Sequence, residues 1–274
     1  MPFRASAGFT ASWEHFDLTI ADGVAALTFT RPERLNALTF DVYADLRDLL
    51  AELPERDDVA VLTITGQGRG FCSGGDVHEI IGELVAMDAR ARLEFTRMTG
   101  AVTQRMREVP LPVIAGINGI AAGAGAVIAL AADLRVVARS ASFQLLFTRV
   151  GLSGADMGIA YLLPRLVGLA KATELLLLGE QFDAERADDL GLVTELVDDE
   201  ELGPAVERLA RRLADGPTLA YGATKALLTR ELDASLGGAI ELEALVQALL
   251  MGTEDHAEFH AAFRDKREPR WKGR

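Results

Sequence analysis

The sequence predicts an α/β protein with a mostly parallel sheet and helices packed outside it. Three observations support this class. Apolar strand-like runs alternate with amphipathic helical segments over residues 17–138, helical segments dominate from about residue 155, and 49% of the 274 residues are apolar. We expect a core over residues 1–200 and a helical region over residues 201–274, joined without a flexible linker.

The first elements follow from local patterns. "FDLTIADGVAALTFTRP" alternates apolar residues around Asp22-Gly23, which is a hairpin turn signal. "TFDVYADLRDLLAELPE" is an amphipathic helix with Thr39 as N-cap and Pro54 after its end. "DVAVLTITG" is a buried strand that leads into the glycine-rich loop "GQGRGFCSGGD".

The later elements are a long helix over roughly 77–107, and then a strand, a turn, a small-residue helix and a strand in "LPVIAGINGIAAGAGAVIALAADLRVVA". One further strand is expected at "GLVTELV". Four helical segments complete the chain: "LGPAVERLARRLADG", "PTLAYGATKALLTREL", "GAIELEALVQALLM" and "TEDHAEFHAAFRDKREP".

Charge and cysteine content exclude several classes of function. The formal net charge of −13 argues against nucleic acid or anionic lipid as the main partner. Cys72 is the one cysteine, so no intramolecular disulfide can form and a reducing compartment is expected. The first residues lack a signal-peptide pattern and no run of eighteen apolar residues occurs. We therefore expect a cytoplasmic protein without membrane or nucleic-acid partners.

Several short motifs do not carry the chemistry they superficially suggest. "HEIIG" at 78–82 lacks the second histidine of a zinc site, so no metal is expected. "GLSGA" at 151–155 does not follow a strand, which disfavours Ser153 as a nucleophile. "GAGAVI" at 123–128 is only a partial dinucleotide fingerprint.

Two small-residue loops remain, "FCSGGDV" at 71–77 and "GIAAGAGAVI" at 119–128. Each follows an expected strand and opens a helix, where free backbone N–H groups attract anions. If the loops converge, they form an oxyanion hole for a developing carbonyl charge. The alternative, which local sequence favours, is that the glycines serve turns and close packing.

Six segments together resemble one family. They are "TRPERLNALT", "GRGFCSGGDV", "PVIAGINGIAAGAGAVIALAADLRV", "ASFQLLFTRVGLSGADMGIAYLLPRLVG", "ADDLGLVTELV" and "FRDKREPRWKGR". In order and spacing they are similar to the enoyl-CoA hydratase/isomerase (crotonase) superfamily. The resemblance implies the ClpP/crotonase fold, a spiral of ββα units with a C-terminal helical trimerisation region, and a homotrimer or dimer of trimers.

The resemblance also implies an acyl-CoA thioester substrate, with no cofactor besides the coenzyme A it carries. Its thioester oxygen would lie between the N–H groups of Gly75 and Ala124. The residues implied to line the CoA portion are Arg34, Leu35, Ala37, Ser73, Gly74, Asp76 and Val77, with Lys272 as a weaker candidate.

The departures from the family pattern shape the expected mechanism. The two positions that carry glutamates in typical hydratases are Val127 and Phe147 here, and neither can transfer a proton. Asp156 matches the position just after the "GL" turn that holds an acid in several isomerases. From local sequence alone, "SGAD" instead fits a capping box of Ser153 and Asp156. Glu79 is a weaker candidate for a second acid.

The sequence thus predicts an enzyme that stabilises a thioester enolate and uses Asp156 as acid and base. Isomerisation of an enoyl-CoA double bond is placed slightly ahead of hydration. Two alternatives stay open, namely an acyl-CoA thioester hydrolase on the same scaffold and a CoA-binding protein with reduced catalysis. The sequence does not determine the acyl-chain specificity.

Overall fold

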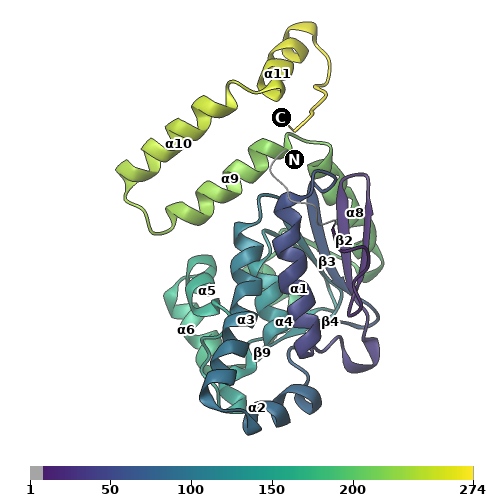
Figure 1. Ribbon diagram of the computed structural model, residues 1–274, viewed down its shortest axis with the longest axis vertical. Helices are drawn as coiled ribbons and strands as arrows, with labels where there is room; N and C mark the ends of the chain where they lie inside the picture. The colour runs from purple at the N-terminus through teal and green to yellow at the C-terminus, as the bar shows by residue number, and fades with distance from the viewer. Residues whose placement is uncertain (1–8, 274) are drawn as a thin grey trace.

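The computed structural model describes residues 9–273 and shows two sheets covered by helices (Figure 1). The larger sheet has the strand order β1 (Asp17–Ala21), β2 (Val24–Phe29), β3 (Val61–Gly66), β5 (Val113–Ile117), β7 (Leu134–Ala138) and β10 (Glu195–Val197). The smaller one has the order β4 (Gly70–Cys72), β6 (Ile120–Ala122), β8 (Ser142–Gln144) and β9 (Gln181–Asp183). Within the described residues only the pairs β1–β2 and β8–β9 are antiparallel, which confirms the mostly parallel arrangement.

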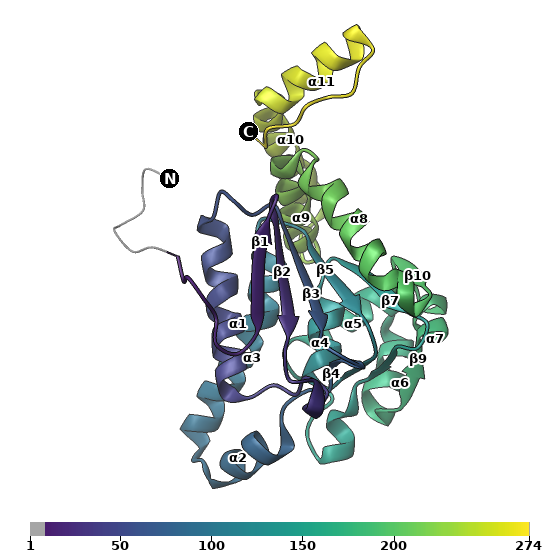
Figure 2. The same cartoon turned by 90° about the vertical axis from the view of Figure 1, so that its right-hand side faces the viewer.

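The helices are α1 (Phe40–Glu52), α2 (Gly82–Ala86), α3 (Ala89–Glu108), α4 (Ala124–Ala131), α5 (Ile159–Val167), α6 (Leu169–Leu178), α7 (Ala184–Asp189), α8 (Leu202–Ala214), α9 (Thr218–Glu231), α10 (Leu236–Leu250) and α11 (Glu254–Asp265). In Figure 2, α1 and α3 lie on one face of the larger sheet and α8 covers the other. The side chain of Thr39 caps α1 by accepting from the Val42 amide, as predicted.

The chain confirms the spiral of ββα units. Strand β3 is followed by β4 and a helical segment, β5 by β6 and α4, and β7 by β8 and α5. In each unit the first strand joins the larger sheet and the second strand joins the smaller one. The sequence pattern alone missed the four short strands of the smaller sheet, because strands of three residues give too little alternation to detect.

Two local predictions were wrong. The expected helix over 77–107 is interrupted, because Met87 is extended and the Asp88 side chain starts α3 by accepting from the Ala91 amide. The segment before α2, Val77–Ile81, is a π-helical turn. The capping box at 153–156 does not form either, since α5 starts only after Gly158, whose φ is +85°.

The C-terminal helices confirm the expected helical region. Helices α9, α10 and α11 project from the body in Figure 1, and α10 has no buried residue. The division of the chain at residue 200 stays a prediction. Residues 1–8 of the predicted core lie outside the described residues. Within residues 9–273 no single helix is long and apolar enough to cross a membrane. Among the described helices, only α10 and α11 taken together have the length and composition of a membrane-spanning segment, and the two are bent by 69° relative to each other.

Candidate active site

The two small-residue loops meet at one edge of the smaller sheet. Strands β4 and β6 pair in parallel, so their carboxyl ends lie side by side. The approach is close: a Cβ added to Gly74 would lie 2.9 Å from the Ala122 carbonyl oxygen and 3.4 Å from the Ala124 amide nitrogen. Gly74 has φ +97° and Gly123 has φ +51°, which L side chains rarely adopt. Glycine at these two positions is therefore required for the convergence.

The predicted oxyanion pair, Gly75 and Ala124, occupies this junction. The Leu38 amide donates to the Gly74 carbonyl oxygen and the Asp76 amide donates to the Leu38 oxygen, both at 2.8 Å. The peptide N–H of Gly75 lies between these two bonds and so faces away from Leu38. Ala124 is the first residue of α4, where an N–H has no partner in the helix. Across residues 9–273 neither amide donates a hydrogen bond to any acceptor, so both can donate to an anion.

The residues implied to line CoA lie on two loops that hydrogen bonds join. The Ser73 amide donates to the Leu35 carbonyl oxygen at 2.9 Å, in addition to the two bonds of Leu38. The side chain of Arg34 is exposed and Ala37 is buried. The structure therefore brings the seven residues into one region, while contact with CoA stays a prediction. Lys272 lies elsewhere, with its Nζ 2.8 Å from Glu254 on α11.

Asp76 and Glu79 have a structural partner in Arg31. The buried Asp76 carboxylate accepts from the amides of His78 and Glu79 and lies 3.1 Å from the Arg31 guanidinium. Burial would raise the pKa of Asp76, but these two amides and Arg31 outweigh it and lower the pKa. Glu79 is exposed and pairs with Arg31 at 2.8 Å. Arg31 also donates to the Ala37 carbonyl oxygen at 2.7 Å, so it ties both loops together.

Asp156 is a partly buried carboxyl group in the loop before α5. Its Oδ1 accepts from the Met157 amide at 2.9 Å, and no cation pairs with it in the described chain. Burial raises the pKa of Asp156, and the Met157 amide only partly opposes this. A raised pKa brings a carboxyl group closer to the range that is useful for moving protons. The Ser153 hydroxyl accepts from the Ala155 amide instead of capping a helix.

Tyr43 on α1 lies beside this junction, which the sequence did not reveal. Burial, and to a smaller extent its neighbours Cys72 and Asp156, raise the pKa of its hydroxyl well above the ordinary value. Its position on the buried face of an amphipathic helix gave no signal beyond packing. Val127 and Phe147 are buried. Neither side chain can transfer a proton.

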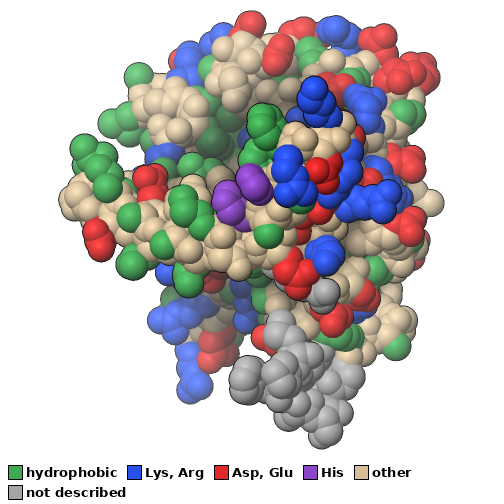
Figure 3. Space-filling model, turned by 90° about the horizontal axis from the view of Figure 1, so that it is seen from above, with side chains coloured by type: hydrophobic (Ala, Val, Ile, Leu, Met, Phe, Trp, Pro, Cys, Tyr) green, Lys and Arg blue, Asp and Glu red, His purple; other side chains and the backbone are tan. Residues whose placement is uncertain are grey.

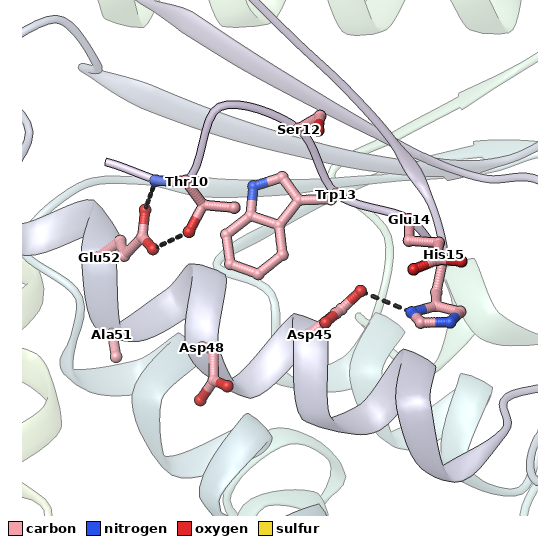
Figure 4. A pocket seen from close by; sticks show the side chains of 9 residues that line it. All are labelled: Thr10, Ser12, Trp13, Glu14, His15, Asp45, Asp48, Ala51 and Glu52. Carbon is pink, nitrogen blue, oxygen red and sulfur yellow. Dashed lines mark hydrogen bonds and ion pairs between the residues drawn. The ribbon is translucent and has the colours of Figure 1, made fainter. Parts of the chain in front are cut away.

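A cavity of about 550 Å³ lies elsewhere, along the outer side of α1 (Figure 4). Its polar groups pair with each other. The Nδ1 atom of His15 lies 2.7 Å from Asp45, and the Thr10 amide donates to Glu52 at 3.1 Å. No described residue of the glycine loops lines it. No cluster of His, Cys, Asp or Glu side chains in the described chain could hold a metal ion.

The spiral of ββα units and the two converging amides define a class of α/β enzymes that act on thioesters. The sequence model described as "Enoyl-CoA hydratase/isomerase" matches residues 19–274, so the chain belongs to this family. Its relatives include enzymes named for CoA thioesters and an isomerase named for an acyl-carrier-protein thioester. The resemblance noted in the sequence is thereby confirmed.

Individual relatives differ in their reactions. The chain is 37% identical over 255 residues to the 1,2-epoxyphenylacetyl-CoA isomerase of Escherichia coli K12, covering 93% of this chain and 97% of that enzyme. It is 32% identical to the crotonyl-CoA hydratase of Syntrophomonas wolfei, covering 94% and 97%. The crystal structure of an enoyl-CoA hydratase from Bacillus anthracis superposes with a TM-score of 0.89 at 28% identity, covering 95% and 100%. The family and the fold are therefore shown, and the family includes both an isomerase and a hydratase.

Proposed function

We propose that this enzyme isomerises the double bond of an enoyl-CoA, with Asp156 as both base and acid. Gly75 and Ala124 hold the thioester oxygen with their N–H groups. The Asp156 carboxylate removes a proton from the α-carbon of a 3-enoyl thioester, and the electron pair moves onto the thioester oxygen as a dienolate. The protonated Asp156 then returns the proton to the γ-carbon. The product is the 2-enoyl thioester, and no atom is gained or lost.

One observation carries this proposal. Asp156 is the carboxyl group near the site whose pKa burial raises, while Val127 and Phe147 are buried and apolar. Hydration needs groups that activate water and protonate the α-carbon, whereas isomerisation needs one group that carries one proton between two carbons. A single acid therefore favours isomerisation.

Kinetics with two substrates test the reaction. A 3-enoyl-CoA is expected to be converted to the 2-enoyl-CoA, and a 2-enoyl-CoA is expected to gain water much more slowly. Chromatography of the products separates the outcomes. Preferential formation of a 3-hydroxyacyl-CoA would show a hydratase, and release of free CoA detected with a thiol reagent would show a hydrolase.

Calorimetry tests the CoA portion of the proposal. We expect an acyl-CoA to bind more tightly than its free acid, because the loops of Arg34 and Ser73 would contact only the CoA portion. Arg34 is exposed, so its guanidinium is free to reach a phosphate. Equal affinity for both ligands, or binding of neither, would contradict the assignment.

A further inference from the structure

The hydroxyl group of Tyr43 lies beside the oxyanion site without a partner. It is 3.8 Å from the position that a Cβ of Gly75 would take. Since Cβ and the amide nitrogen are bonded to the same Cα, the hydroxyl lies next to the peptide whose N–H would hold the substrate oxygen. Tyr43 is only 3% exposed. No hydrogen bond of this hydroxyl is found among residues 9–273, although a buried phenol usually has one.

The ring of Tyr43 is held in place by its neighbours. Phe95 on α3 packs edge-on against it, with ring centroids 5.8 Å apart and an interplanar angle of 86°. Phe95 also packs edge-on against Phe40. The hydroxyl therefore lies on a fixed scaffold between α1 and α3, which is the kind of support that positions a functional group.

The chemistry of the hydroxyl fits a donor and excludes a base. Burial, and to a smaller extent the neighbouring Cys72 and Asp156, raise the pKa of Tyr43 well above its ordinary value. The phenol thus stays protonated at neutral pH and can donate one hydrogen bond.

We propose that the Tyr43 hydroxyl donates a hydrogen bond to the thioester oxygen of the bound substrate, as a third donor beside the N–H groups of Gly75 and Ala124. This inference rests on the proposed function. The bond strengthens as the oxygen gains negative charge, so it stabilises the enolate more than the substrate. It gives a partner to a hydroxyl that has none among residues 9–273.

Replacing Tyr43 by phenylalanine removes the hydroxyl and keeps the ring. We expect the rate of α-proton exchange of a saturated acyl-CoA in D₂O, followed by NMR, to fall roughly 100-fold. This exchange reports enolate formation whichever final reaction the enzyme catalyses. The carbonyl stretch of a bound, ¹³C-labelled thioester should move back toward its value in solution. The melting temperature should stay nearly unchanged, because the ring keeps its packing against Phe95.

Tyr161→Phe is the matched control. The Tyr161 hydroxyl lies on the surface and donates to Asp233 at 2.7 Å, so this variant should exchange α-protons at the wild-type rate. Wild-type rates and an unshifted carbonyl stretch in Tyr43→Phe would overturn the role of Tyr43 and leave the proposed function intact. Loss of melting temperature in parallel with rate would assign Tyr43 to packing. If the wild-type protein neither binds acyl-CoA nor exchanges its α-protons, the proposed function fails and Tyr43 loses this role with it.

Discussion

At the residue scale, Asp156 carries the proposed chemistry, and its replacement by asparagine separates catalysis from folding. The asparagine Oδ1 can still accept from the Met157 amide, but it cannot exchange a proton. We expect turnover of a 3-enoyl-CoA to fall roughly 100-fold or more, with acyl-CoA binding kept. Glu79→Gln is the control, because Glu79 is exposed and paired with Arg31. Near-normal turnover in Asp156→Asn would remove Asp156 from the mechanism.

The same carboxyl group should make stability depend on pH. Burial raises the pKa of Asp156 in the folded state, so the folded protein binds the proton more tightly than the unfolded chain. The contribution of Asp156 to the free energy of unfolding is therefore fully present below the pKa of the unfolded chain, which is about 4. This contribution is lost as the pH rises through the pKa of the folded state. Melting curves of wild type and Asp156→Asn at pH 7 should show the variant more stable, with the difference shrinking toward pH 4. A variant less stable at pH 7 would contradict the burial argument.

The raised pKa also sets the direction of the pH–rate profile. Catalysis that begins with the Asp156 carboxylate needs the ionised form, so kcat/KM should fall as the pH falls through its pKa. The midpoint in the free enzyme should lie above the value of about 4 typical of an exposed aspartate. Rates measured between pH 4 and 8 with a non-ionising acyl chain test this. A profile that is flat down to pH 4 would exclude this carboxylate as the base.

At the element scale, the start of α4 supplies a backbone donor that proline can remove. Proline is tolerated at the first residue of a helix, where its missing N–H would have no helical partner. Ala124→Pro should therefore keep α4 while lowering kcat/KM roughly 100- to 1000-fold, the effect of losing one oxyanion donor. Ala124→Gly keeps the N–H and should keep most activity. Equal activity of the two variants, with unchanged melting curves, would show that this amide does not act.

A buried lysine fastens α9 to the body of the molecule. The Nζ of Lys225 lies 2.7 Å from Asp133 and donates to the carbonyl oxygens of Met106 and Leu111. Lys225→Met should cost about 3 kcal/mol of unfolding free energy, because the partly buried Asp133 and two buried carbonyl oxygens lose their donor. Lys171→Met, which removes the more exposed pair with Glu174, should cost at most about 1 kcal/mol. Equal urea midpoints for both variants would contradict this.

At the scale of the whole molecule, the projecting helices need a partner surface. Seen from above (Figure 3), apolar side chains lie along these helices, while charged side chains crowd the opposite side. Large apolar residues are well exposed there, among them Leu236, Leu249 and Phe263, at 78%, 76% and 75%. Monomeric proteins rarely leave such faces open.

We therefore predict a trimer or a hexamer in solution. Light scattering at micromolar concentration checks the mass. Leu249→Asp should lower the mass toward the monomer, because it places a charge in the apolar face, while Glu241→Asp on the same helix should not. A monomeric wild-type protein would contradict the prediction.

The sequence by itself determined the fold class, the family and the loops that hold the site. Glycine-rich segments after strands, an N-cap at Thr39 and helical periodicity are local signals, so they could be read without coordinates. The tertiary structure decided what lies opposite each loop. Only the parallel pairing of β4 with β6 placed Gly75 beside Ala124, and only the packing of α1 against α3 placed the Tyr43 hydroxyl there. Local sequence patterns also could not predict two other features. Arg31 pairs with Glu79 through a contact between distant segments, and the capping box at Ser153 does not form because of the backbone angles before α5.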